Sequence, residues 1–130
     1  MLSAFDLTLH GVRSVVHDMR PRAPSDAVVF VQGNPGPSDD WEGLAPRVAA
    51  FARVVAMDMP GFGRADRPKA FDFTIVGFAR YLGDILDAVG VQRAHLVLHD
   101  FGGPWGLAWA AEQPERVASV TLINTGVVPG

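Results

Sequence analysis

Residues 95–109, with the sequence HLVLHDFGGPWGLAW, join two apolar patterns through a single acidic residue, Asp100. The residues before Asp100 are typical of a buried strand, and those after the following pair of glycines are typical of an apolar helix. A carboxylate at the end of a buried strand is costly unless it is paired, solvated or used in chemistry. The position of Asp100 therefore needs a physical explanation, and the rest of the chain limits the choices.

The composition excludes several classes of function. The 130 residues are 48% hydrophobic and 19% charged, which fits one compact domain with a real core. The net charge is -3 and the 11 basic residues are scattered, so we expect neither nucleic acid nor a membrane as a partner. The chain has no cysteine, which excludes disulfides and thiolate metal ligands, and we expect no metal and no cofactor. Because no signal-peptide core and no membrane-spanning run is present, we expect a cytoplasmic protein.

Strand and helix patterns alternate along the chain. Two short alternating segments around a turn at His10 and Gly11 predict an antiparallel pair at one edge of a sheet, over 5–9 and 13–17. Continuously apolar segments predict strands that are buried on both faces, over 27–31, 53–57, 94–98 and 117–123. Helical patterns cover 41–51, 74–89 with Thr74 as N-cap, and 103–113 with Pro104 in the first turn. This order predicts a three-layer α/β/α sandwich with a mostly parallel sheet.

Three polar or glycine-rich loops follow strands of this predicted sheet. They cover residues 32–41, 58–68 and 99–104. Glycine and proline after a single strand are ordinary turn chemistry. Ligands of parallel sheets bind beyond the carboxyl ends of the strands, so three such loops together indicate a site at that edge.

Asp100 occupies the sharpest of these turns. A side chain at a tight turn from strand to helix is held at the top of the sheet, near the unsatisfied N–H groups of the helix start. Gly102 and Gly103 are the small neighbours that such a turn needs, whereas Leu98 is bulkier than the usual residue at its position. Asp is also a common helix cap. On this residue alone, a functional carboxylate and a simple cap remain equal alternatives.

Together the loops resemble those of the α/β-hydrolase superfamily, and within it the branch with an Asp nucleophile that contains haloalkane dehalogenases and epoxide hydrolases. The resemblance runs from about Phe5 to Val128. The nucleophile elbow of that branch is commonly His-Asp-Trp-Gly-Gly, which residues 99–103 match except at Phe101. The oxyanion loop His-Gly-x-Pro is matched at 32–35 with Gln in place of His, and Asp-x-Pro-Gly-x-Gly is present at 58–63.

The resemblance implies that Asp100 attacks a carbon atom and becomes an alkyl ester, which water activated by a His then hydrolyses. The backbone N–H groups of Phe101 and Asn34 would form the oxyanion hole, and Gly33 would let the loop approach closely. Gly33, Pro35 and Phe101 are the expected substrate-binding residues. The expected function is therefore a hydrolase acting on a small organic electrophile, an epoxide or a haloalkane.

Three residues bear on the choice between these substrates. Haloalkane dehalogenases typically have Trp after the nucleophile, whose indole N–H helps to hold the halide, and Phe101 has no such donor. Asn34 occupies the position of a second halide-binding amide in many of those enzymes, or it shapes its loop as Asn before Pro often does. Tyr81 is the single tyrosine, and we expect it to pack in its helix rather than act as the lid tyrosines of epoxide hydrolases do.

The catalytic acid and the catalytic His of the family are not visible in this sequence. Asn124 lies where one dehalogenase group carries its acid. We expect residues 1–130 to be the N-terminal part of a single α/β-hydrolase core domain that is inactive alone, with both groups beyond Gly130. The histidines present are all expected to be structural: His10, His17, His95 and His99.

Two alternatives of the same fold stay open. An ester or lactone hydrolase would normally have Ser at position 100, so Asp100 argues against it. A non-catalytic binding protein can retain the fold without the chemistry. The sequence leaves the substrate and the oligomeric state undetermined.

Overall fold

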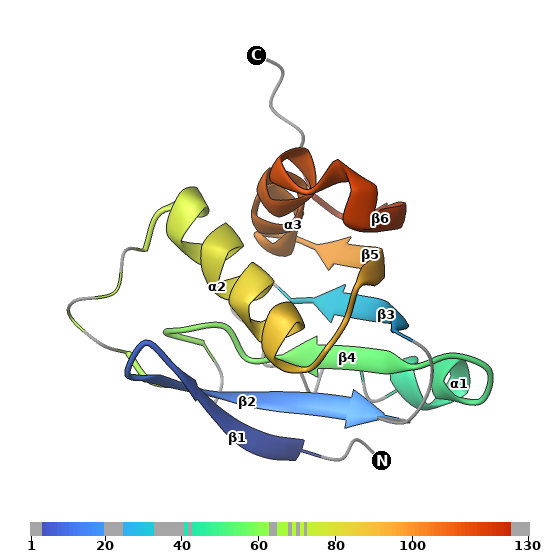
Figure 1. Ribbon diagram of the computed structural model, residues 1–130, viewed down its shortest axis with the longest axis horizontal. Helices are drawn as coiled ribbons and strands as arrows, with labels where there is room; N and C mark the ends of the chain where they lie inside the picture. The colour runs from blue at the N-terminus through green and yellow to red at the C-terminus, as the bar shows by residue number, and fades with distance from the viewer. Residues whose placement is uncertain are drawn as a thin grey trace.

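The computed structural model describes residues 4–19, 25–32, 41, 43–62, 65–67, 69, 71 and 73–125. Six strands form one sheet in the order β1-β2-β4-β3-β5-β6 (Figure 1). The strands are β1 (Ala4–Leu9), β2 (Val12–Met19), β3 (Asp26–Val31), β4 (Val54–Met57), β5 (Arg93–His99) and β6 (Val117–Ile123). The helices are α1 (Ala45–Ala49), α2 (Ile75–Ala88) and α3 (Gly102–Glu112), with a short 3-10 turn at Pro114–Arg116.

The sheet is antiparallel at one edge and parallel through the rest. Strands β1 and β2 form a hairpin whose turn has positive φ angles at His10 and Gly11, of 54° and 77°. Strand β2 also pairs antiparallel with β4, whereas β4, β3, β5 and β6 are mutually parallel. This arrangement confirms the predicted antiparallel edge pair and the mostly parallel sheet.

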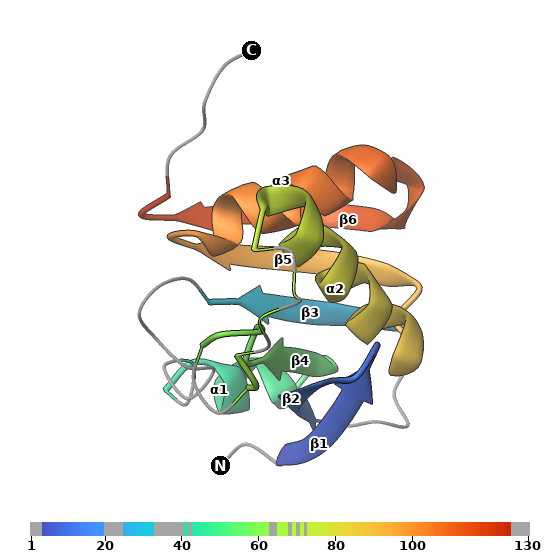
Figure 2. The same ribbon diagram turned by 90° about the vertical axis from the view of Figure 1, so that its left-hand side faces the viewer.

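Helices cover both faces of the sheet, as the alternation along β3 shows. Val29 and Val31 belong to the larger core cluster, which packs against α2 and α3. Phe30, between them in sequence, belongs to a smaller cluster with Trp41 and Ala45 on the α1 side. Figure 2 shows α2 and α3 side by side over the same face of the sheet. The predicted three-layer sandwich is therefore confirmed.

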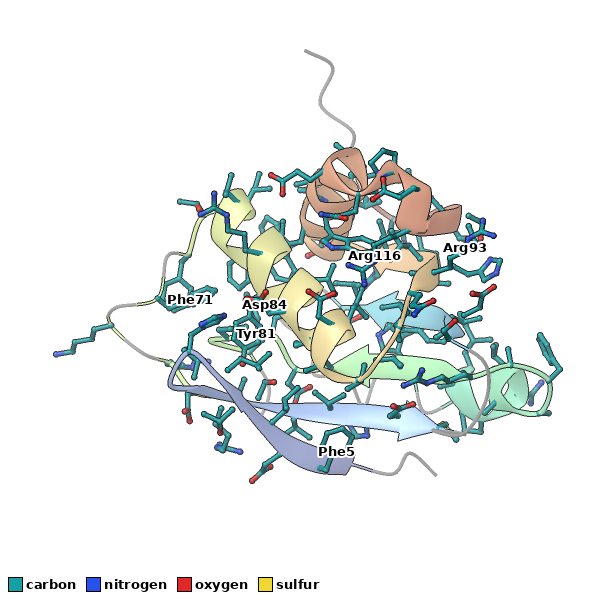
Figure 3. All side chains as sticks on the ribbon, viewed as in Figure 1. Phe5, Phe71, Tyr81, Asp84, Arg93 and Arg116 are labelled. Atoms are coloured by element: carbon teal, nitrogen blue, oxygen red, sulfur yellow. The ribbon has the colours of Figure 1, made fainter. Side chains whose placement is uncertain are left out.

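Helix α2 follows the predicted pattern. The Thr74 side chain accepts a hydrogen bond of 3.1 Å from the Gly77 backbone N–H, which confirms Thr74 as the N-cap. Leu82 and Ile85 are fully buried on the inner face, and each contributes about 1.5–3 kcal/mol by leaving water. Tyr81 is buried in the same helix and donates a 2.8 Å hydrogen bond to the Val12 carbonyl. Figure 3 shows its ring beside Phe71, so the expected packing role of Tyr81 is confirmed.

Helix α1 is shorter than predicted. The pattern over 41–51 predicts three turns, whereas the observed helix spans only Ala45–Ala49. Pro46 explains the difference, because it has no N–H to bond to a helical residue four positions earlier. A helix that contains Pro46 can therefore begin no more than about one turn before it.

The prediction of strands buried on both faces holds for β3 and β4 but is wrong for β5 and β6. In β5 only alternate residues are buried, under α3, and the other face is partly exposed. In β6, residues 119–122 are all exposed. Strand β6 lies at an edge of the sheet in the described structure, and an apolar sequence alone does not reveal which neighbours cover a strand.

Candidate active site

Asp100 forms the turn between β5 and α3 in a left-handed backbone conformation. Its φ angle is 55°, which is uncommon for a residue with a side chain and is a form of backbone strain that clusters at active sites. Phe101 follows with the helical angles φ -64° and ψ -20°, and it is the N-cap residue of α3. The chain therefore reverses from strand to helix within one residue, and that residue carries the carboxylate.

The Asp100 side chain does not cap α3. The N-cap residue is Phe101, and no side chain caps this helix end. The Asp100 carboxylate is half-buried and makes no hydrogen bond or ion pair with the other described residues. These observations contradict the interpretation of Asp100 as a helix cap. They leave the Asp100 carboxylate beside the uncapped first turn of an 11-residue helix.

Three glycines let α3 approach the sheet closely at this turn. A Cβ atom at position 102 would overlap the carbonyl of Val31 at the end of β3. A Cβ at position 103 would overlap the Thr125 side chain, and one at 106 would overlap Leu98. Gly102 and Gly103 thus have the predicted role of small neighbours, and Gly106 makes room for the bulky Leu98.

The Asp100 backbone is bonded on both sides. Its N–H donates to the carbonyl of Ile123 at 3.4 Å. Its carbonyl accepts 3.0 Å and 2.6 Å hydrogen bonds from the Gly103 N–H and the Thr125 hydroxyl. Thr125 has no role in the sequence prediction, because one Thr after a strand forms part of no motif. Only the pairing of β5 with β6 brings it to the turn.

Phe101 presents two different groups beside the carboxylate. Its backbone N–H donates no hydrogen bond to the described residues, so this donor is available to a ligand. Its side chain is 51% exposed and stacks on Trp105, with ring centroids 6.3 Å apart. Trp105 in turn stacks on Phe78 at 4.2 Å and contacts Phe62 at 5.5 Å. One side of the turn is therefore aromatic and apolar.

The other residues expected at the site belong to the loop after β3. Gly33, Asn34 and Pro35 lie outside the residues that the structure describes. The end of β3 itself is placed, because Val31 pairs with Leu98 of β5. The next residue, Gln32, is buried and lies with its Oε1 3.2 Å from His99 Nδ1. The predicted oxyanion loop thus begins beside the strand that carries Asp100.

The described residues of the loop after β4 supply apolar packing beside the turn at Asp100. Asp66 ties it to β2, since the Asp66 carboxylate accepts from the Arg13 N–H at 2.9 Å and the Asp66 N–H donates to the Arg13 carbonyl at 2.8 Å. Gly61 has a positive φ of 86° and lies close to the Phe73 ring. Phe62 joins the aromatic side chains beside Phe101 through Trp105. The glycine-rich loop therefore forms part of the apolar wall.

The four histidines occupy the structural places that we expect for them. His10, in the hairpin turn, lies 2.7 Å from the carboxylate of Asp84 in α2. His95 Nδ1 lies 2.7 Å from Ser119 Oγ. His17 is buried in β2. The His99 ring contacts Trp41, on the α1 side of the sheet. In the described part of the chain, no group of three or more His, Cys, Asp or Glu side chains is arranged to hold a metal ion.

No helix in the described residues has both the length and the hydropathy needed to cross a membrane.

A pocket away from Asp100 lies at the C-terminal end of α2, where Arg116 donates to the Val91 carbonyl at 2.6 Å and pairs with Asp87 at 2.9 Å. The charges there are engaged in structural contacts. The turn at Asp100 is thus the candidate active site.

The curated relatives of this chain include proteins of different activity. A haloalkane dehalogenase from Agrobacterium fabrum is 32% identical over 121 residues, which cover 93% of this chain and 38% of that enzyme. A 2-hydroxy-6-oxo-2,4-heptadienoate hydrolase from Pseudomonas putida is 34% identical over 117 residues, covering 88% of this chain and 41% of that enzyme. The chain therefore spans about two fifths of the length of these relatives.

The fold comparison agrees with the sequence comparison. The crystal structure of a haloalkane dehalogenase from Agrobacterium tumefaciens matches with a TM-score of 0.84 and 28% identity, over 95% of this chain and 41% of that one. The family model of the alpha/beta hydrolase fold matches residues 26–129, which include β3 to β6 and the turn at Asp100. The chain therefore belongs to the α/β-hydrolase fold family.

Proposed function

We propose that this chain supplies the nucleophile of a hydrolase, Asp100, which attacks a small haloalkane and forms a covalent alkyl ester. The observation that carries the proposal is the carboxylate of Asp100, half-buried, without a partner among the described residues, and fixed at a left-handed turn. Among the described residues it forms no ion pair, and it does not cap its own helix. Its strained position supports a role in chemistry.

In the first step, a carboxylate oxygen of Asp100 attacks the carbon that bears the halogen. The carbon–oxygen bond forms as the carbon–halogen bond breaks, and the halide leaves with the bonding electron pair. A carboxylate is a weak nucleophile, so it must be held in line with the carbon and away from bulk water. The fixed backbone of Asp100 supplies the orientation, and the exposed ring of Phe101, which stacks on the buried Trp105, supplies an apolar surface for the alkyl group.

In the second step, water adds to the carbonyl carbon of the ester. The oxyanion that forms needs hydrogen-bond donors already in place. The N–H of Phe101, which donates to no described residue, suits this role, and we propose the N–H of Asn34 as the second donor, with Gly33 and Pro35 shaping the loop toward substrate. Loss of the alcohol restores the Asp100 carboxylate and releases one proton. The described histidines lie elsewhere, so this step has no base assigned among them.

The relatives support a haloalkane as the first choice of substrate, since the dehalogenase from Agrobacterium fabrum shares 32% identity with this chain. An epoxide is the second candidate, and Phe101 favours it. Opening an epoxide requires no halide-binding donor, and the exposed Phe101 ring provides none. The same nucleophile would attack an epoxide carbon, and the ring oxygen would take up a proton as its bond breaks.

An ester hydrolase of this fold is less well supported. Attack of Asp100 on an ester carbonyl would give a mixed anhydride, a reactive intermediate that the alkyl-ester route avoids. The hydrolase from Pseudomonas putida shows that relatives at similar identity carry different activities. The type of nucleophile therefore distinguishes these activities better than overall sequence identity does.

Bromide release tests the proposal. The chain is mixed with excess n-butyl bromide, and free bromide is measured against time for the parent and for Asp100→Asn. We expect a single burst of about one bromide per parent chain without turnover, since the second step has no base among the described residues. We expect no burst from Asp100→Asn, because an amide cannot displace the halide as a carboxylate does. Equal bromide release from both forms would contradict Asp100 as the nucleophile.

A further inference from the structure

We infer that Thr125 is a positioning residue for Asp100, acting through the carbonyl group of that residue. The inference rests on the proposed role of Asp100 as a nucleophile. Thr125 follows β6, and its hydroxyl donates a 2.6 Å hydrogen bond to the Asp100 carbonyl oxygen. The two residues are 25 positions apart in the chain, so the contact is made by the tertiary fold and not by the turn itself.

The end of β6 and the residues that follow it bond to both backbone groups of Asp100. His99 pairs with Ile123 in the parallel register of β5 and β6, and the Ile123 carbonyl accepts the Asp100 N–H at 3.4 Å. Asn124 has a positive φ of 45°, which bends the chain after β6. Thr125 then reaches the Asp100 carbonyl. The N–H and the carbonyl of one residue are thus both bonded to residues 123–125.

This contact depends on Gly103 in α3. A Cβ atom at position 103 would overlap the Thr125 side chain, so glycine leaves the space that the threonine occupies. The Gly103 N–H donates to the Asp100 carbonyl oxygen at 3.0 Å, the same atom that accepts from Thr125. The Asp100 carbonyl therefore has two donors, one from its own helix and one from the neighbouring strand end.

These bonds explain how a strained residue keeps a single orientation. A left-handed φ of 55° at a residue with a side chain persists only where the surroundings fix it. The backbone orientation fixes the direction of the Cα–Cβ bond of Asp100, from which the carboxylate is only one rotatable bond away. If the carbonyl loses the Thr125 bond, the backbone can rotate, and the carboxylate leaves the line of attack on carbon.

A pair of substitutions separates the hydroxyl from the shape of the side chain. Thr125→Val keeps the branched shape and removes the donor, whereas Thr125→Ser keeps the donor. Single-turnover bromide release with n-butyl bromide gives the limiting rate and the concentration of half-saturation for each form. We expect Thr125→Val to lower the limiting rate about tenfold with half-saturation nearly unchanged, and Thr125→Ser to restore the rate to within about twofold.

The outcomes distinguish this inference from the proposed function. If the parent releases no bromide burst, the proposed role of Asp100 fails. If the parent shows the burst and Thr125→Val matches its limiting rate, Asp100 stands as the nucleophile and the positioning role of Thr125 is wrong. Thermal unfolding is measured in parallel, with Thr125→Ala as a second variant. If Thr125→Val and Thr125→Ala both fail to fold while Thr125→Ser folds, the hydroxyl is required for folding rather than for positioning Asp100, which also overturns the inference.

Discussion

The side chain of Leu98 fills the space that a side chain at Gly106 would need. Leu98 is fully buried in β5, and a Cβ at position 106 would overlap its terminal methyl groups. The usual nucleophile elbow has a small residue in the strand so that the helix can approach. Here the small residue is on the helix, which explains how the turn at Asp100 tolerates a leucine two residues before it.

This pairing predicts a coupled effect on stability. Gly106→Ala should lower the free energy of unfolding by about 1–3 kcal/mol, because the added methyl overpacks the core. In the double variant with Leu98→Ala, the methyl enters the space left by the leucine. The double variant should therefore lose less free energy of unfolding than the two single variants lose in sum. Urea unfolding of the four forms measures this coupling.

Gly43→Ala is the matched control, since a Cβ at position 43 meets nothing within 4 Å. We expect little change in its urea midpoint. Additive losses in the double variant would show that Leu98 and Gly106 do not share this space.

Tyr81 predicts a loss of stability at alkaline pH. Burial raises the pKa of Tyr81 above its ordinary value of 10.0, the neighbouring Ser14 hydroxyl lowers the pKa, and the charges of Asp66 and Asp84 raise it. The unfolded chain therefore releases this proton at a lower pH than the folded chain. The stabilising contribution is complete below pH 10.0 and is lost as pH rises through the raised pKa of the folded state.

Urea unfolding at about pH 8 and about pH 11 of the parent and of Tyr81→Phe checks this dependence. The parent should lose more free energy of unfolding between the two pH values than Tyr81→Phe does. At the lower pH, Tyr81→Phe should be less stable by about 1–3 kcal/mol, because the buried Val12 carbonyl loses its donor. Equal pH dependence in the two proteins would show that Tyr81 does not contribute.

Strand β6 predicts self-association of the chain. Its sequence, VASVTLI, carries no charge, and Val120 and Leu122 are 39% and 42% exposed. An uncharged apolar strand at a sheet edge is a template for pairing with another chain. We expect residues 1–130 to form oligomers, and Val120→Lys to shift the population toward monomer.

Light scattering during gel filtration over a range of concentrations measures the mass. Thr8→Lys on the opposite edge strand, β1, is the control, since Thr8 is also exposed. A monodisperse monomer of the unmodified chain would show that the β6 edge does not associate. The Val120→Lys form is the suitable background for the kinetic experiments if the parent aggregates.

Phe101 predicts weak halide binding. Phe101→Trp adds an indole N–H beside the carboxylate, and one hydrogen bond to an anion should improve bromide affinity by about tenfold. The fluorescence of Trp105, which stacks on Phe101, reports on bromide in both forms. Phe73→Trp, at another exposed aromatic position, controls for the added fluorophore. Tight bromide binding by the unmodified protein would show that Phe101 does not limit halide recognition.

The sequence predicts those parts of the fold that depend on local chemistry. The apolar runs of β3 and β4, the Thr74 cap and the glycines after Asp100 each have a local physical cause, and the structure confirms them. Pro46 was also visible in the sequence, and its missing N–H explains the short helix α1. The length of that helix was therefore predictable from a rule that the apolar pattern alone does not include.

The remaining features depend on neighbours that are distant in the sequence. The exposure of β6 follows from its place at the sheet edge, and the space for Leu98 follows from a glycine on another element. The bond from Thr125 to Asp100 requires both the register of β5 with β6 and the positive φ of Asn124. No pattern of residue types near Asp100 contains that information.

The role of Asp100 as the nucleophile is tested by the mass of the peptide that contains it. The chain is incubated with n-butyl bromide, quenched in acid and digested, and the mass of each peptide is measured by mass spectrometry. We predict one added butyl group on the peptide with Asp100, located at that residue by fragmentation, and no addition in Asp100→Asn shown by mass to be free of deamidation. A butyl group on other carboxylates with Asp100 unmodified, or equal labelling of the Asp100→Asn form, would contradict Asp100 as the nucleophile.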